Sequence, residues 1–106
     1  MNPAPSKYSM YPDPKHWNGM YQVYLLKSLK NNSLYIGYTK DLNRRLEEHN
    51  AGLAEYTRKY LPWTLIYYES YLSLEDAKKR EKSLKHFGKA YSLLKNRITS
   101  CLKNGK

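Results

Sequence analysis

With 106 residues, the chain is long enough for one domain with a modest core and too short for two. Its 41% hydrophobic and 14% aromatic residues argue against disorder, and the single cysteine, Cys101, excludes an internal disulfide and a cysteine-rich zinc site. The net charge of +10 favours a polyanionic partner. No apolar run reaches the about 20 residues of a membrane span, and the first residues lack a secretory pattern, so we expect a cytoplasmic location.

The positive charge is concentrated in the last third of the chain. From Lys78 to Lys106 there are ten basic residues and one acid, Glu81. A localised basic surface suits nucleic acid, which is the commonest polyanion. The alternative is that exposed lysines only keep a small protein soluble.

The first half of the chain predicts an irregular arm followed by a β-hairpin. Residues 1–19 hold four of the five prolines, which disfavour a helix and a strand ladder. Residues 20–27 are rich in β-forming residues and predict a strand, and residues 33–37 predict a second one. Residues 30–32 suit a tight turn, so the two strands are expected to be antiparallel.

A helix is predicted for residues 41–50, with Thr39 or Asp41 as its N-cap and Gly52 after its end. A polar loop follows over residues 51–61. The next run of β-forming residues, 64–69, predicts a third strand.

Two helices are predicted after the third strand. Ser73 and Asp76 form a capping-box pattern, and the helix that they begin is expected to end at about Phe87, with Gly88 closing it. A further amphipathic stripe over residues 90–102 predicts a helix at the end of the chain.

The predicted order is therefore β-β-α-β-α-α, an α+β fold. Three short strands cannot bury both faces of their sheet without helices. We expect a small, mostly antiparallel three-stranded sheet flanked by three helices. One domain over residues 20–106 would follow the proline-rich arm of residues 1–19.

Glu81 is the most informative position when the residues are taken alone. It falls at the helical spacing of Ala77 and Leu84, beside a stripe that is expected to be buried. A carboxylate in such a place is costly unless it is paired or binds a cation. A salt bridge to Lys78 or Lys85 is the structural alternative.

Arg45 and His49 lie one helical turn apart and are expected to project together. A guanidinium stabilises charge on a phosphate, and an imidazole can relay a proton near neutral pH. Tyr24 and Tyr35 are either site groups or strand aromatics that pack across the hairpin.

The order and spacing of several short motifs resemble the GIY-YIG nuclease family over about residues 20–98. The motifs are Gln22-Val23-Tyr24, Tyr35-Ile36-Gly37, the T-x-D-L-x-x-R-L-x-x-H run from Thr39 to His49, Pro62-Trp63 and Ala77-x-x-Arg80-Glu81. The first tripeptide keeps its tyrosine but has Gln where the family has Gly. The chain looks like a small stand-alone member, similar to the N-terminal catalytic domain of the family's excision-repair nucleases.

The resemblance implies a metal-dependent endonuclease that hydrolyses phosphodiester bonds in DNA during repair or recombination. Tyr35 would activate the attacking water, Tyr24 would help to position it, Arg45 would stabilise the charged transition state, and His49 would relay a proton. Glu81 would be the protein ligand of one divalent ion, Mg²⁺ or Mn²⁺, which is reasonable for a cation that keeps several waters.

Contacts to nucleic acid are expected from a further set of residues, which are Gly37, Tyr38, Arg44, Lys78, Lys82 and Lys85. Gly37 would let a phosphate approach the backbone. Tyr38 departs from some excision-repair members, which carry a lysine at that place. Two alternatives stay open: a non-catalytic nucleic-acid-binding module that reuses the fold, and a basic partner of a larger repair complex.

Overall fold

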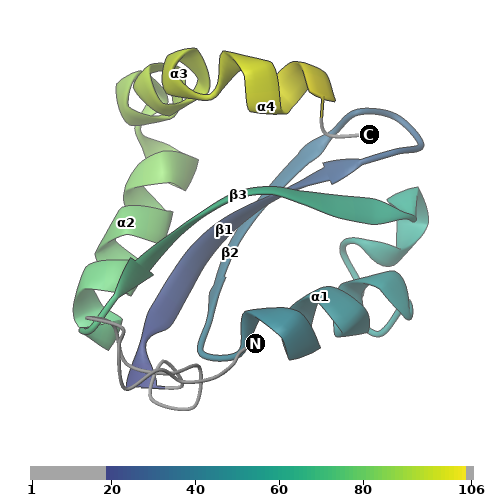
Figure 1. Cartoon of the computed structure of the whole chain (residues 1–106), viewed down its shortest axis with the longest axis horizontal. Coiled ribbons are helices and arrows are strands. Elements are labelled where there is room, and N and C mark those ends of the chain that lie inside the picture. The colour runs from purple at the N-terminus through teal and green to yellow at the C-terminus, as the bar shows by residue number, and fades with distance from the viewer. Residues whose placement is uncertain (1–18, 105–106) are drawn as a thin grey trace, which may run out of the picture.

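The computed structural model describes residues 19–104. Residues 1–18, which make up nearly all of the predicted arm, lie outside the described residues. Figure 1 shows a twisted sheet between helices. The elements in chain order are β1 (Tyr21–Ser28), β2 (Leu34–Thr39), α1 (Leu42–Asn50), the short 3-10 helix η2 (Arg58–Tyr60), β3 (Trp63–Tyr71), α2 (Leu74–His86), α3 (Gly88–Arg97) and α4 (Thr99–Asn104).

The sheet has three antiparallel strands in the order β2-β1-β3, so the α+β prediction is confirmed. The hairpin turn between β1 and β2 uses Asn32 at a φ of 64°, a backbone conformation that asparagine tolerates better than most residues. Tyr24 lies in the central strand, opposite Gly37 of β2 on one side and Tyr68 of β3 on the other. Because β2 is an edge strand, its outer side does not pair with another strand of this sheet.

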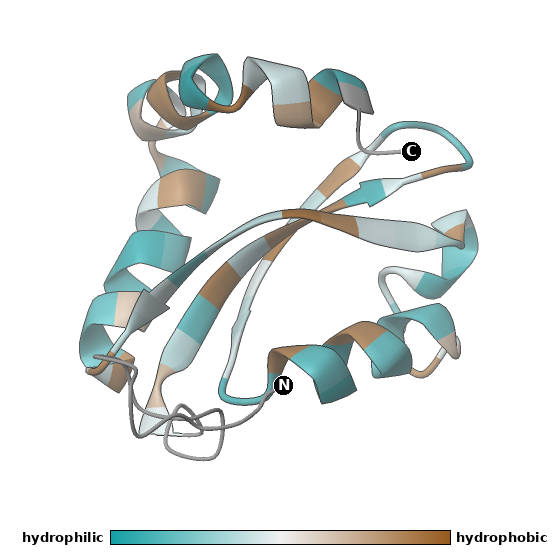
Figure 2. Ribbon diagram, viewed as in Figure 1, coloured by the Kyte–Doolittle hydropathy of each residue, from teal (hydrophilic) through white to brown (hydrophobic). Residues whose placement is uncertain are grey.

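Alternation along β1 divides the interior into two apolar clusters, one on each face of the sheet. Val23 and Leu25 pack with residues of α2 and α3, whereas Tyr24 and Leu26 pack with Trp63 and with residues of α1. Figures 1 and 2 show the same division: α1 covers one face, α2 to α4 cover the other, and hydrophobic segments line both sides of the sheet.

The C-terminal region differs from the prediction, because the expected last helix is two helices. Phe87 both ends α2 and precedes α3, so Gly88 begins α3 instead of closing α2. The chain breaks again at Ile98, where the side chain of Thr99 donates to the carbonyl oxygens of Lys95 and Asn96 and competes with the helical ladder. The buried Lys27 holds the next segment by donating to the carbonyl oxygen of Leu102.

Within residues 19–104, the helices are all too short or too polar to cross a membrane.

Candidate active site

The site is built around Tyr24 in the middle of the sheet. Its side chain is 1% exposed, and it lies over the backbone of β2 at Gly37. A Cβ atom added to Gly37 would be 2.6 Å from the Tyr24 hydroxyl oxygen, which is closer than any real contact. Gly37 is therefore needed for the tyrosine to occupy this position. Its predicted role in admitting a phosphate stays a prediction.

A chain of buried polar groups runs from Tyr24 into the core. The Tyr24 hydroxyl is 2.9 Å from Nε2 of His49, and Nδ1 of His49 is 2.7 Å from Oγ1 of Thr57. The indole N–H of Trp63 donates to the backbone carbonyl of Thr57 at 2.7 Å. Both ring nitrogens of the fully buried His49 therefore have partners, and the loop residue Thr57 is a member that the sequence prediction missed.

Burial keeps both ring systems neutral. It lowers the pKa of His49 to about 4, with help from the positive charge of Arg45. It also raises the pKa of Tyr24 to about 12, against the opposing effect of Arg45. The proton relay through His49 stays a prediction, and with this lowered pKa His49 would act in it as a neutral imidazole. The hydrogen bond between His49 and Tyr24 also orients the Tyr24 hydroxyl.

Tyr35 is the more accessible of the two motif tyrosines. It lies on β2, half-buried, with its ring centroid 5.0 Å from that of His49 and 6.2 Å from that of Tyr24. On its other side, the ring of Tyr56 is 5.8 Å away. The hydrogen-bond partner of His49 is Tyr24, whereas Tyr35 contacts the imidazole edge-on.

Arg45 lies beside Tyr24, whereas Arg44 points toward solvent. The Arg45 guanidinium donates to Glu48 at 2.9 Å, which is the main cause of its raised pKa, and it also interacts with Tyr24. The side chain of Arg44 is 73% exposed and only reaches Glu48 at 3.4 Å. One carboxylate thus anchors both arginines, and Arg45 is the one held beside Tyr24.

Glu81 comes from α2, on the other face of the sheet, and approaches the site at the edge strand β2. Its carboxylate is 2.7 Å from Nζ of Lys85, so the salt bridge that the spacing allowed is present. The same ammonium lies 5.8 Å from the ring centroid of Tyr35. The charge of Glu81 is also one of the causes that raise the pKa of Tyr24. Glu81 and the motif tyrosines therefore meet around β2 despite starting from opposite faces.

Glu81 offers a metal ion a single carboxylate. Among the described residues, no three His, Cys, Asp or Glu side chains are grouped as metal ligands. One carboxylate suits a hard cation that takes its other oxygens from water and phosphate. The ammonium of Lys85 now pairs with this carboxylate. Because the Lys85 side chain is 40% exposed, it could turn toward solvent when a metal ion binds Glu81.

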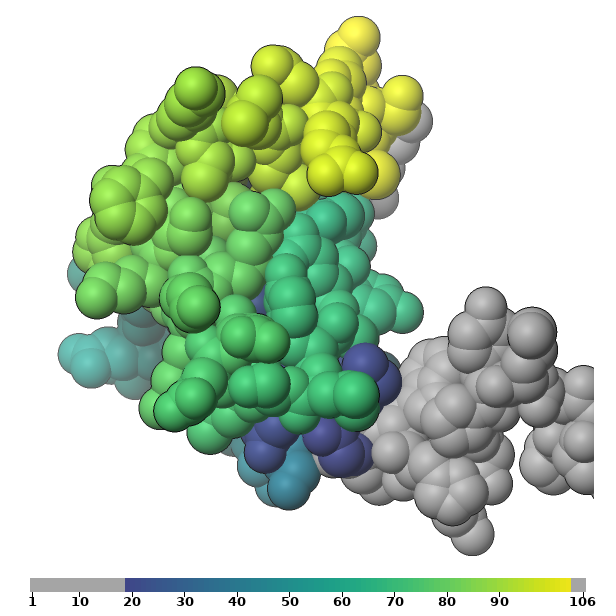
Figure 3. All heavy atoms as spheres, turned by 90° about the vertical axis from the view of Figure 1, so that its left-hand side faces the viewer, coloured from purple at the N-terminus to yellow at the C-terminus, as the bar shows by residue number. Residues whose placement is uncertain are grey.

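The other predicted contact residues are spread around this centre. Tyr38 is 38% exposed on β2. Lys78 and Lys82 are exposed on α2, about two turns and one turn before Lys85, respectively, along similar sides of the helix. Figure 3 looks onto the outer side of α2 and α3, which form one surface beside β3. Contacts between these lysines and nucleic acid stay a prediction.

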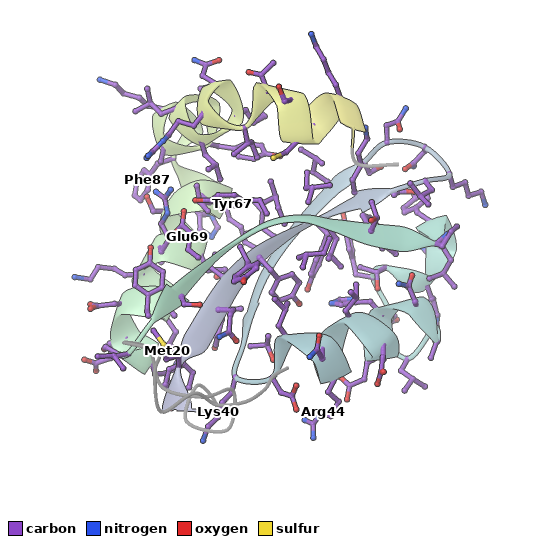
Figure 4. The ribbon with its side chains drawn as sticks, viewed as in Figure 1. Met20, Lys40, Arg44, Tyr67, Glu69 and Phe87 are labelled. Atoms are coloured by element: carbon purple, nitrogen blue, oxygen red, sulfur yellow. The ribbon has the colours of Figure 1, made fainter. Side chains whose placement is uncertain are left out.

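A second polar cluster was not predicted. Glu69 of β3 accepts two bonds of 2.9 Å from Nε and Nη2 of Arg80, and it also accepts from the hydroxyls of Tyr67 and Tyr71. Burial acts to raise the pKa of Glu69, but these hydrogen bonds outweigh it and lower the pKa. Burial raises the pKa of Tyr67 and of Tyr71 to about 12. Figure 4 shows Tyr67 and Glu69 on the side of β3 that faces α2. The period of two in Tyr67, Glu69 and Tyr71 was the available signal.

Similarity to known proteins supports the resemblance seen in the motifs. The family model described as the GIY-YIG catalytic domain matches residues 20–100. The UPF0213 protein SH2523 of Staphylococcus haemolyticus is 42% identical over 72 residues, which are 67% of this chain and 87% of that protein. A UPF0213 protein of Staphylococcus aureus is 44% identical over 66 residues, covering 61% and 79% of the two chains. The solution structure of the UPF0213 protein BH0048 from Bacillus halodurans is similar with a TM-score of 0.48 at 34% identity, covering 74% of this chain and 86% of that one. The chain belongs to the GIY-YIG family of nuclease catalytic domains.

Proposed function

We propose that the protein is a metal-dependent endonuclease that hydrolyses phosphodiester bonds in DNA. The observation that carries this proposal is the meeting of groups around β2. Tyr24, Tyr35 and Arg45 come from one face of the sheet, and Glu81 comes from the other. A hairpin with a purely structural role does not need a guanidinium and a carboxylate beside the same two tyrosines.

In the proposed reaction, the oxygen of a water molecule bonds to phosphorus while the bond to the leaving sugar oxygen breaks. Tyr35, the more accessible of the two tyrosines, is the group that removes the proton from the attacking water, and the ammonium of Lys85 lies 5.8 Å from its ring centroid. Arg45 stabilises the negative charge that builds on the phosphate oxygens. Tyr24 stays protonated, because of its pKa of about 12, and orients the substrate by donating a hydrogen bond.

The residues present fit one divalent cation, Mg²⁺ or Mn²⁺, on Glu81. Its carboxylate is a hard ligand that already attracts an ammonium at 2.7 Å. When bound, the ion would neutralise charge on the phosphate and on the leaving oxygen. The role of Lys85 would then change from partner of Glu81 to contact for the phosphate.

The proposal is tested by replacing Glu81→Gln, which keeps the shape of the side chain and removes its charge. We expect cleavage of a plasmid in Mg²⁺ or Mn²⁺ to fall at least a hundredfold, to the level seen with chelator, while DNA binding in a gel shift is retained or strengthened. The matched control is Glu75→Gln, at an exposed position of the same helix. Cleavage by the Glu81 variant at the rate of the control would contradict the proposal.

A second candidate function is a nucleic-acid-binding module without catalysis. The Glu81–Lys85 salt bridge favours it, because a carboxylate with a protein partner needs no metal. In that case Glu81→Gln would lower the free energy of unfolding by at least the roughly 0.3–0.5 kcal/mol of an exposed helix pair, because the Glu81 side chain is only 17% exposed, and no metal-dependent cleavage would be found for any variant. Binding by the basic residues after Lys78, alone or within a larger repair complex, would still weaken steeply as salt rises.

A further inference from the structure

A pocket of about 470 Å³ adjoins the candidate site at the edge strand β2. Its walls combine three aliphatic side chains with three tyrosines, namely Leu34, Ile36, Leu84, Tyr35, Tyr56 and Tyr91. Lys85 completes the lining, so the pocket shares Tyr35 and Lys85 with the groups around Glu81. A volume of this size and an apolar wall with a few polar groups are typical of sites for small molecules or for parts of larger ligands.

Tyr56 is the feature that the fold itself does not explain. It lies in the loop between α1 and η2, and its side chain is 68% exposed. Its ring packs against Tyr35 at a centroid distance of 5.8 Å and an interplanar angle of 35°, so one face of an aromatic ring is presented at the pocket. Exposed aromatic faces of this kind are how proteins bind unpaired bases, because stacking needs no particular sequence.

The charges at the pocket are complementary to phosphate. Nζ of Lys85 lies 5.8 Å from the ring of Tyr35, and Nζ of Lys95 lies 4.5 Å from the ring of Tyr91. Lys85 lines the pocket itself, whereas Lys95 lies outside the lining, against the ring of Tyr91. An apolar peptide segment has no negative charge to pair with these cations. A nucleotide within a strand has a flat base that can stack and a negative phosphate on either side.

We propose that this pocket binds one unpaired nucleobase of the substrate, stacked against Tyr56, next to the phosphate at the candidate active site. The base would enter from solvent at the edge of β2, and Lys85 would contact the phosphate beside it. A base in the pocket cannot also be stacked in a duplex. The substrate class is therefore nucleic acid with an unpaired nucleotide beside the cut, such as a single strand or an open junction, and not continuous duplex.

The test measures binding without cleavage. A short single-stranded oligonucleotide carrying 2-aminopurine, whose fluorescence reports stacking, is titrated with the Glu81→Gln protein in the presence of chelator. We expect Tyr56→Ala to weaken single-strand binding about tenfold and to abolish the change in fluorescence, with Tyr56→Phe restoring both. The matched control is Phe87→Ala, which removes a 61% exposed aromatic ring outside the pocket and should leave binding unchanged.

The position of the base next to the cleaved phosphate rests on the proposed function. The binding of a base in the pocket does not, so the pocket and the nuclease activity can be refuted separately. Equal binding of single strands by Tyr56→Ala and by the parent protein would overturn the pocket, even if the enzyme cleaves DNA. An equal loss on a fully paired duplex would overturn it as well, because Tyr56 would then act only as a general contact. A selective single-strand defect in a protein that never cleaves would support the pocket and refute the nuclease.

Discussion

The burial of His49 makes the stability of the protein depend on pH. In the folded state the pKa of His49 is about 4, compared with 6.5 for an accessible imidazole. Between these values the unfolded chain binds a proton that the folded chain does not, so acidification favours unfolding. At about 1.4 kcal/mol per pKa unit, the full loss from this one residue is about 3 kcal/mol, and about 2 kcal/mol of it falls between pH 7 and pH 5.

Urea unfolding at a series of pH values measures this effect. The expected result is a free energy of unfolding that is full above pH 6.5, declines through pH 5 and levels off with respect to His49 below pH 4. The control is His49→Gln, which cannot titrate. It should be less stable at pH 7, because Tyr24 and Thr57 lose a matched partner, yet show a much smaller slope between pH 7 and pH 5. A flat profile for the parent protein, or the same slope in the variant, would refute the reasoning. The pKa of Glu69 is lowered, so the stability that Glu69 contributes is lost only at more acidic pH, below the ordinary pKa of a carboxyl group.

Two further predictions concern packing. Gly37→Ala should lower the free energy of unfolding by about 1–3 kcal/mol and abolish cleavage, because its Cβ would displace the buried Tyr24. The control is Gly88→Ala, whose Cβ has no atom within 4 Å. It should be neutral in both urea unfolding and a cleavage assay. Equal melting of the two variants would show that the close approach is not rigid. Arg80→Leu should cost about 2 kcal/mol by leaving Glu69 without its cation, whereas the exposed Lys79→Leu should change stability by less than about 0.5 kcal/mol in the same assay. An Arg80 variant as stable as the Lys79 variant would mean that the pair contributes nothing to the fold.

The elements were predictable because their signals are local. The alternation in β1 and the apolar stripes of the helices are read over a few residues, and they give the element order and the antiparallel hairpin. The arrangement β2-β1-β3 of the strands within the sheet was not predicted. The break at Ile98 was missed because it depends on whether the Thr99 hydroxyl donates to water or to the preceding carbonyl oxygens, and the sequence does not show which. The extra residue of β3, Ile66, at which the register with β1 shifts, likewise has no signature in composition.

The residues of the candidate site were named from the sequence, but their burial, their hydrogen-bond partners and their pKa values were not. The motifs placed Arg45 and His49 on one helix face, yet they could not show that His49 would be sealed by Thr57 from the following loop. The pairing of Glu81 was open between two lysines, and the structure shows it with Lys85. Long-range packing, which no short pattern encodes, set the burial of His49 and the pKa values of His49 and Tyr24. The cytoplasmic location and the extent of the domain stay predictions.

The buried polar chain described above has a consequence for the history of such proteins. Tyr24, His49 and Thr57 satisfy one another inside the fold, so a descendant that had stopped cutting nucleic acid would still be selected to keep them for folding. Arg45 and Glu81 reach the partly exposed rim and contribute little to the core. Among relatives, retention of the tyrosine and the histidine alone would therefore not distinguish an active enzyme from an inactive one. The loss of the rim arginine or glutamate is the change that would mark a lineage in which the chemistry has been abandoned.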